Sequence, residues 1–214
     1  MSDAATRLAT VRAEIARAAR LARRDPAEIT LVAVSKRRPV AEIEALIASG
    51  QSDFGESRVQ EAQDKWPALR AAHPHVRLHM IGQLQSNKAA EAAALFDVIH
   101  SLDRGSLLAA LAAAPDRKPC FVQVNVGGEE QKGGVALGEL AEFIAAVRGS
   151  PVPLAGLMAI PPNDLEPGPF FALLSELARR HDVTGLSMGM SGDYATAVML
   201  GATVVRVGTA LFED

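Results

Sequence analysis

The sequence is poor in several residue types, and each shortage excludes a class of protein. Its 214 residues include a single cysteine, Cys120, which excludes an intramolecular disulfide framework and is typical of the reducing cytoplasm, where we expect this protein. Aromatic residues make up only 4% of the chain, with Trp66 and Tyr194 as its one Trp and one Tyr. Ala, Val, Leu and Ile dominate instead, which favours packed helices and buried branched strands over an all-β sandwich or barrel.

A surplus of basic residues and a long apolar run are missing as well. Lysine and arginine together number 22 against 25 acidic residues, and the formal net charge is −3, so no basic field is available to recruit nucleic acid. No apolar run approaches the roughly 18–20 residues of a membrane span. We therefore expect neither nucleic acid nor a membrane as a partner.

The Arg-rich start of the chain, residues 6–24, predicts a helix rather than a transit peptide. Acidic residues, which transit peptides avoid, lie in and around it at Asp3, Glu14 and Asp25. An amphipathic helix packed on the domain is expected, because the apolar residues fall at helical spacing. These are Leu8, Val11, Ile15, Ala18 and Ala22.

Short branched segments alternate along the rest of the chain with Ala-rich segments of helical period. The predicted strands are residues 29–36, 53–57, 77–82, 97–103, 120–126, 154–160, 185–190 and 204–209. The predicted helices between and after them are residues 40–48, 59–72, 88–94, 104–113, 137–148, 170–181 and 194–200.

This alternation predicts an α/β fold with a parallel sheet. The nearly continuous apolar runs at 31–34 and 121–124 are typical of strands covered on both faces. Eight strands at a repeat of about 25 residues match a single (β/α)₈ TIM barrel with an extra N-terminal helix. An open doubly wound sheet is the alternative, because periodicity does not prove closure. No composition break divides the chain, so we expect one domain over 1–214, with 1–28 as the N-terminal helix and lead-in.

In such a barrel the chemistry lies at the C-terminal ends of the strands, and Lys36 closes the first one. Two interpretations are open. Lys36 pairs with a carboxylate such as Glu56 or Asp193, or it is a Schiff-base amine. In the second case burial against Val32 and Val34 would disfavour the ammonium form and lower the pKa of the lysine, exposing a nucleophile to an aldehyde.

The ends of the last two predicted strands have the composition of an anion site. Ser191 and Gly192 provide a hydroxyl, room for close backbone approach and the first turn of the helix that follows. Gly208 and Thr209 add two N–H groups and a second hydroxyl from the eighth strand. Loops after strands seven and eight are the usual phosphate cradle of this architecture.

Arg206 lies two residues before Gly208 and therefore on the same face of the strand. Three interpretations of Arg206 are open: a phosphate clamp, a structural ion-pair partner, or a donor to a ring nitrogen. An aldehyde-bearing phosphorylated ring beside a lysine and an arginine is what pyridoxal phosphate requires.

Other constellations favour structural interpretations. His73 and His75 lack partners at zinc-like spacing, so we expect a surface turn and no metal site. The glycine-rich segment 127–134, which contains Lys132, is interpreted as a solvated connection, with a lid as the alternative. Three methionines are expected to fill the core, although one of them could touch a ligand ring: Met158, Met188 and Met190.

Specific motifs run through nearly the whole chain in one order. They are LVAVSK (31–36), FGESRVQE (54–61), HMIGQLQSNK (79–88), VNV with GEE (124–130), GLM (156–158), LSMGMSGD (186–193) and VRVGTALF (205–212). Together they resemble the pyridoxal-phosphate homeostasis protein family of alanine-racemase-like barrels. Ser57 stands where the family usually has Asn, Leu78 where it often has Trp, and Gln83 where it often has His.

The resemblance implies a fold type III pyridoxal-phosphate barrel and a role for each matching residue. Lys36 would form the Schiff base, and Arg206 would face the pyridine nitrogen, which a guanidinium keeps unprotonated. The phosphate would be held by Ser191, Gly208 and Thr209, with Gly192 allowing the approach. The ring would be surrounded by Val34, Ser57, His79 and Asn125.

The implied function is to hold pyridoxal 5'-phosphate as a lysine aldimine and to take part in intracellular vitamin B6 homeostasis, with apoenzymes as acceptors. Racemase activity is not expected. A racemase needs a second base, a Tyr supplied by an extra domain, whereas this chain ends at Asp214 and its one Tyr is Tyr194. The alternatives are a small pyridoxal-phosphate enzyme acting weakly on amino acids, and a Schiff-base aldolase whose substrate carries the phosphate. With no extended apolar stripe, a monomer is expected.

Overall fold

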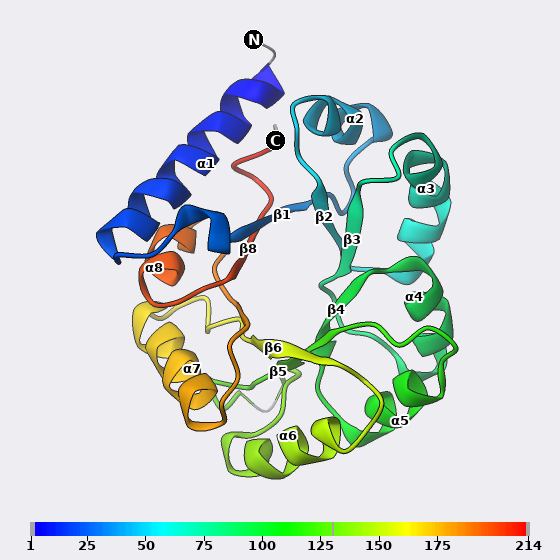
Figure 1. The fold of residues 1–214 in the computed structure, drawn as a ribbon, viewed down its shortest axis with the longest axis vertical. Helices are drawn as coiled ribbons and strands as arrows, with labels where there is room; N and C mark the ends of the chain where they lie inside the picture. Colours follow the sequence, from blue (N-terminus) through cyan, green and yellow to red (C-terminus); the bar gives the residue numbers. More distant parts are fainter. Residues whose placement is uncertain (1–2, 130, 213–214) are drawn as a thin grey trace.

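Eight parallel strands form a closed barrel surrounded by helices (Figure 1). The computed structural model describes residues 3–129 and 131–212, so Glu130 of the GEE motif lies outside the described residues. The strands are β1 (Thr30–Val34), β2 (Asp53–Glu56), β3 (Arg77–Met80), β4 (Val98–Leu102), β5 (Cys120–Gln123), β6 (Leu154–Met158), β7 (Leu186–Ser187) and β8 (Val204–Val207). The helices are α1 (Asp3–Leu21), α2 (Val40–Ala48), α3 (Val59–Ala72), α4 (Ala89–Leu95), α5 (Gly105–Ala113), α6 (Leu140–Arg148), α7 (Gly168–Arg180) and α8 (Tyr194–Met199). Short 3₁₀ turns are η1 (Pro26–Glu28), η2 (Ser86–Lys88) and η3 (Leu137–Glu139).

The barrel closes where β1 pairs with β8. Val32 lies opposite Arg206 and Ala33 opposite Val207 in that parallel pair. The predicted (β/α)₈ barrel is therefore confirmed, and the open doubly wound alternative is wrong.

Alternation along each strand divides the apolar residues into two layers. Outward residues such as Ala33 and Val205 pack beneath the helices in the larger core. A smaller cluster fills part of the barrel interior. It consists of Val32, Val98, Phe121, Met158 and Val204.

Helix α1 packs beside α8, outside the barrel (Figure 1). Leu8, Val11 and Ile15 are buried along one of its faces, as the helical spacing predicted. Arg7 Nε donates to Leu211 O at 3.0 Å, which ties α1 to the segment after β8. No helix in the described part of the chain combines the length and the apolar character of a membrane span.

Every predicted strand is present, but each ends one to three residues earlier than the sequence pattern predicted. The chain leaves the sheet at residues such as Ser35, Ser57 and Met190, where turns begin. At Met190 the apolar pattern continues past the end of the strand, because this side chain faces the mouth of the barrel. Residues beyond the strand ends, such as Ser57 and Met190, line that mouth.

A buried carboxylate braces the outer side of β1 and β2. Glu56 has no exposed surface, and its Oε1 accepts hydrogen bonds from Ser35 Oγ at 2.8 Å and from Trp66 Nε1 at 3.0 Å. Lys65 Nζ lies 2.8 Å from the same oxygen, while Oε2 is buried without a partner. A buried ionised carboxylate that lost its cation would be left uncompensated.

We expect Lys65→Met to destabilise the fold by ~3 kcal/mol or more, because it removes the cation from buried Glu56. The free energy of unfolding from urea titrations measures this. The matched control is Lys88→Met, which breaks an exposed lysine–glutamate pair with Glu91 and should change little. Equal losses in the two variants would contradict the assignment.

Candidate functional site

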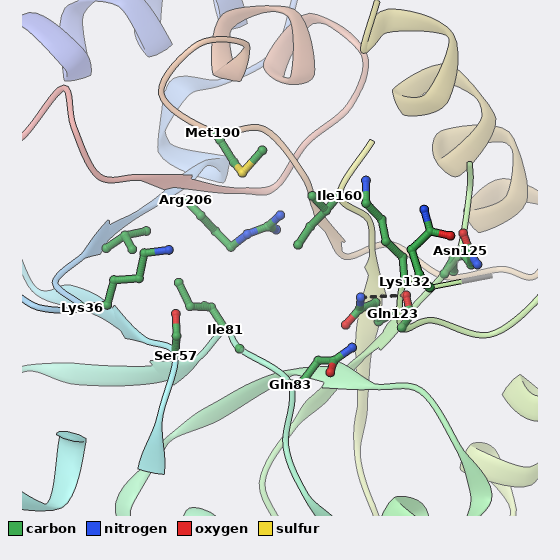
Figure 2. Close-up of a pocket in the computed structure, with 15 residues that line it drawn as sticks. Lys36, Ser57, Ile81, Gln83, Gln123, Asn125, Lys132, Ile160, Met190 and Arg206 are labelled. Atoms are coloured by element: carbon green, nitrogen blue, oxygen red, sulfur yellow. Dashed lines mark hydrogen bonds between the residues drawn. The ribbon is translucent and has the colours of Figure 1, made fainter. Parts of the chain in front are cut away.

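The mouth of the barrel, at the C-terminal ends of the strands, contains a cavity of about 400 Å³. A hollow of about 350 Å³ shares Val34, Lys36, Met190 and Arg206 with it and extends to the loops after β7 and β8. These sizes are typical of small-molecule sites. Figure 2 shows Lys36 and Arg206 projecting into the cavity, from the turn after β1 and from β8.

Lys36 lies in a turn two residues after β1 ends. The turn continues through Arg37, whose φ is +59°, and is held from behind by Lys65 Nζ, which donates to Ser35 O at 3.0 Å. The residue is exposed, so the predicted burial against Val32 and Val34 is wrong for the protein without a ligand. Within residues 3–129 and 131–212, no hydrogen-bond or ion-pair partner contacts Lys36 Nζ.

The carboxylates offered as ion-pair partners of Lys36 are engaged elsewhere. Glu56 pairs with Lys65 on the outer side of the strands. Asp193 Oδ1 accepts the N–H of Met190 at 2.5 Å. The structural ion-pair interpretation of Lys36 is therefore wrong, and its amine is available to a ligand.

Arg206 is 4% exposed and is held by neutral groups. Its Nη1 donates to Ser187 Oγ at 2.5 Å, and its Nη2 donates to Ala159 O at 3.1 Å. Burial lowers the pKa of Arg206 to about 10, against the opposing charge of Asp193, so the guanidinium stays protonated at neutral pH. No carboxylate among the described residues lies within ion-pair distance, so the ion-pair interpretation of Arg206 is wrong as well. A guanidinium carries five N–H donors, and those not used here are available to a ligand.

Two turns, residues 190–193 and 208–210, form the side of the mouth above β7 and β8, and we call them the mouth turns. Ser191 Oγ accepts the N–H of Gly208 at 3.1 Å and so joins them. In the described chain the N–H groups of Ser191, Gly192 and Thr209 have no protein partner. Unpartnered N–H groups beside hydroxyls suit an anion.

The sequence pattern suggested that these donors belong to the first turn of helix α8. In the structure the unpartnered N–H groups precede the helix. Helix α8 has six residues, and the N–H groups of Asp193 and Tyr194 are already bonded to Met190 O. The donor set therefore comes from the turn.

The four residues expected around a ring divide into two groups. Val34, Ser57 and Asn125 line the cavity. His79 does not line it: the side chain is buried lower in the barrel, between Asp53 and His100. The predicted contact of His79 with a ligand ring is a misplacement, because the strand pattern did not show how deep in the barrel the residue lies.

Sequence reasoning missed the loop after β5 as part of the site. Lys132 lines the cavity and forms an ion pair with Glu129 at 2.7 Å, while Gln123 Nε2 donates to Gly133 O at 3.0 Å (Figure 2). The segment is solvated at Gly127, Gly128 and Gln131, as expected, but it also forms part of the cavity lining. Its position directly after a strand end was the available signal. Gln83, Ile81 and Ile160 also line the cavity.

Of the three methionines, Met158 and Met188 are fully buried and fill the core, whereas Met190 lines the cavity. Tyr194 is buried and donates its hydroxyl to Glu14 on α1, and burial together with that carboxylate raises the pKa of the phenol. Its hydroxyl is therefore directed away from the site. No cluster of metal-ligating residues exists within the described ranges.

Gly189 allows the chain to turn sharply into the mouth turns. Its φ is +94°, and a Cβ at this position would lie 2.5 Å from Ala197 Cβ. We expect Gly189→Ala to lower the free energy of unfolding by about 2 kcal/mol or more, through backbone strain and the clash. Urea titration measures it. Gly138→Ala is the control, because a Cβ there meets no atom within 4 Å. A fully stable Gly189→Ala variant would show that the turn does not need glycine.

Comparison with known proteins gives this architecture a family. Residues 7–214 match the model of the family described as alanine racemase, N-terminal domain. The pyridoxal phosphate homeostasis protein of Pseudomonas aeruginosa is 42% identical over 99% of this chain and 96% of its own length. The protein PipY of Synechococcus elongatus PCC7942, solved with PLP bound, superposes with a TM-score of 0.83 at 35% identity and covers 98% of this chain and 100% of that one.

An alanine racemase from Corynebacterium glutamicum shares the barrel with a TM-score of 0.67 at 17% identity, and the match covers 94% of this chain and 60% of the racemase. That likeness concerns the fold alone. The near-complete mutual coverage and the higher identity lie with the homeostasis proteins, and this chain belongs to the pyridoxal phosphate homeostasis protein family.

Proposed function

We propose that this chain binds pyridoxal phosphate at the mouth of its barrel, holds it through Lys36, and takes part in intracellular vitamin B6 homeostasis. One observation carries the proposal. The amine of Lys36, the guanidinium of Arg206 and the unpartnered donors of the mouth turns all face one continuous hollow.

The residues present fit this cofactor group by group. An aldehyde needs a primary amine, and Lys36 Nζ has no other partner in the described chain. A phosphate needs N–H and hydroxyl donors, which Ser191, Gly192 and Thr209 supply at one end of the hollow. A ring nitrogen needs one donor, and Arg206 lines both parts of the cavity.

Bound pyridoxal phosphate supplies an aldehyde carbon and an electron-accepting ring. Lys36 provides the attacking amine, while the mouth turns fix the anionic end and so orient the group toward the lysine. Arg206 stays protonated at neutral pH and donates to the ring nitrogen without giving up its proton. A ring nitrogen that remains unprotonated makes the ring a weaker electron acceptor.

We propose that the protein acts as a carrier rather than an amino-acid racemase. The weak electron acceptor beside Arg206 disfavours loss of an α-proton. Racemisation also needs an opposed pair of bases, and the hydroxyl of Tyr194 is engaged by Glu14 away from the cavity.

Other parts of the proposal concern partners and location. Apoenzymes that need pyridoxal phosphate are the proposed acceptors. A monomer is supported by the scattering of the large exposed apolar side chains over separate elements; these are Leu21, Val40, Leu137, Leu165 and Met199. A cytoplasmic location is supported by the single cysteine, Cys120, which is a free thiol.

The central test is the visible absorption of the protein loaded with pyridoxal phosphate. We expect a yellow wild type and a Lys36→Ala variant without the band or a covalent adduct after borohydride reduction, because the variant lacks the amine. Lys118→Ala, a lysine outside the cavity, should behave as wild type. A band that survives Lys36→Ala would overturn the lysine assignment, and a colourless reconstituted wild type would overturn cofactor binding.

The phosphate assignment has its own variant. Ser191→Ala combined with Thr209→Ala should weaken retention of the cofactor by about tenfold or more, since hydrogen bonds to a charged group are lost. The covalent chemistry at Lys36 should remain. Dialysis against buffer, followed by absorbance, measures retention.

The carrier assignment predicts transfer without turnover. Dialysis of the loaded protein against a pyridoxal-phosphate apoenzyme should restore the activity of that enzyme, because the cavity opens at the barrel mouth. Assays with L- and D-amino acids should show no substantial racemisation. Efficient Lys36-dependent turnover of any amino acid would replace the carrier with an enzyme.

A further inference from the structure

A row of buried hydrogen bonds crosses the interior of the barrel and ends at Arg206. Asp53 Oδ1 lies 3.0 Å from His79 Nε2, and His79 Nδ1 lies 3.0 Å from His100 Nε2. His100 Nδ1 lies 2.8 Å from Ser187 Oγ, which accepts from Arg206 Nη1 at 2.5 Å. We call these five residues, on β2, β3, β4, β7 and β8, the interior chain.

The two ends of the interior chain face different hollows. Asp53 lines a separate hollow of about 430 Å³ at the N-terminal ends of the strands, beside Arg12 and Ser52. Arg206 lines the mouth cavity at the opposite ends of the strands. The chain therefore connects the bottom of the barrel to the proposed cofactor site.

The chemistry of the two ends gives the bonds a direction. A guanidinium only donates and a carboxylate only accepts. With both histidines neutral, His79 therefore carries its proton on Nε2 to meet Asp53, and its Nδ1 accepts from His100 Nε2. His100 Nδ1 then accepts a hydrogen bond from the hydroxyl of Ser187, and the oxygen of that hydroxyl accepts one from Arg206 Nη1. Every donor points from Arg206 toward Asp53.

We propose that the interior chain is a proton-linked switch, in which one proton gained by His79 at the bottom of the barrel reverses the hydrogen bonds as far as Ser187 and loosens the hold on Arg206. The consequence for the cofactor rests on the proposed function. His100 and Ser187 are positioning residues in this scheme, because they act through Arg206.

The two states differ by a single proton taken from solvent. In the protonated state both nitrogens of His79 carry protons, so Nδ1 donates to His100 and no longer accepts. The proton of His100 is then on Nδ1 and points to Ser187 Oγ. Ser187 Oγ then accepts a hydrogen bond from His100 as well as the one from Arg206. The hydroxyl proton of Ser187 can no longer be donated to His100.

The surroundings of His100 keep this histidine neutral. His100 is fully buried, stacks on Phe121 with ring centroids 4.6 Å apart, and faces His79 and Arg206. Burial, followed by the charges of His79 and Arg206, holds the pKa of His100 well below its usual range, so it stays neutral.

Asp53 supplies the negative charge beside His79. It is faced by His79, by Ser52 Oγ at 2.9 Å and by Arg77 Nη1 at 3.7 Å. Burial raises the pKa of Asp53, but the hydrogen bonds from His79 and Ser52 and the charges of His79 and Arg77 outweigh it, and the net shift is downward. The carboxylate is therefore ionised at neutral pH, and its Oδ1 lies 3.0 Å from His79 Nε2.

The direct test is imidazole ¹⁵N NMR of the full chain without cofactor. Above the transition we expect His79 and His100 both protonated on Nε2. As the pH falls, His79 should become a cation while His100 changes to the Nδ1-protonated form in the same transition. Asp53→Asn keeps the accepting oxygen but removes the charge, so it should move the transition to lower pH. A His100 tautomer that does not change when His79 titrates would overturn the switch.

The second test measures release of pyridoxal phosphate as a function of pH. Loaded wild type should release the cofactor faster below the transition, while Ser187→Ala should release it about tenfold faster at high pH and lose that pH dependence. The matched control is Ser101→Ala, because Ser101 is a buried serine beside His100 whose hydroxyl has no partner. It should resemble wild type. Equal effects of the two substitutions would overturn the positioning role.

These readouts separate the two levels of the proposal. A wild type that does not bind pyridoxal phosphate would contradict the proposed function, and the NMR result would still test the switch independently. A yellow wild type that releases pyridoxal phosphate at a rate independent of pH would support cofactor binding and contradict the switch.

Discussion

The pairing of β1 with β8 is the constraint on which the site depends. It places Val32 opposite Arg206, so that Lys36 and Gly208 leave neighbouring strands at the same end of the barrel. A slip of one residue in this register would turn the side chain of Arg206 from the interior into the helix layer. Closure therefore does more than bury strand edges, because it joins the first and last strands into one binding surface.

Strand alternation then separates two polar networks that neighbour each other in sequence. Ser35 and Glu56 face outward and, with Lys65, brace the turn that carries Lys36. Val34 and Lys36 face the mouth. The outer network supports the fold, whereas the amine on the inner side has no partner among the described residues and is left for a ligand.

A buried arginine without a carboxylate is costly unless its donors are satisfied. Ser187 and Ala159 accept two of its N–H groups and hold it in place before any ligand arrives. A guanidinium positioned in this way needs little reorganisation on binding. The same bonds link it to two interior histidines, so the protonation of the barrel interior bears on how the arginine is held.

Several parts of the site were predictable from local pattern. Eight βα units implied a barrel, and the barrel rule placed Lys36, Ser191 and Thr209 at the mouth, where they lie. The strand ends were overestimated, because apolar residues continue past the ends of the strands at segments such as 188–190. Lys132 was missed because a glycine-rich loop has no periodicity that shows where it folds back.

By itself, the sequence determined the order of the elements, the faces of the strands and the family, since these follow from composition, alternation and motifs along the chain. The tertiary structure alone decided which polar groups became partners. Glu56 took Lys65 rather than Lys36, and His79 joined His100 and Asp53 rather than the cavity. The physical reason is that depth in the barrel and register between strands depend on how all eight strands close, and no local stretch of sequence contains that information.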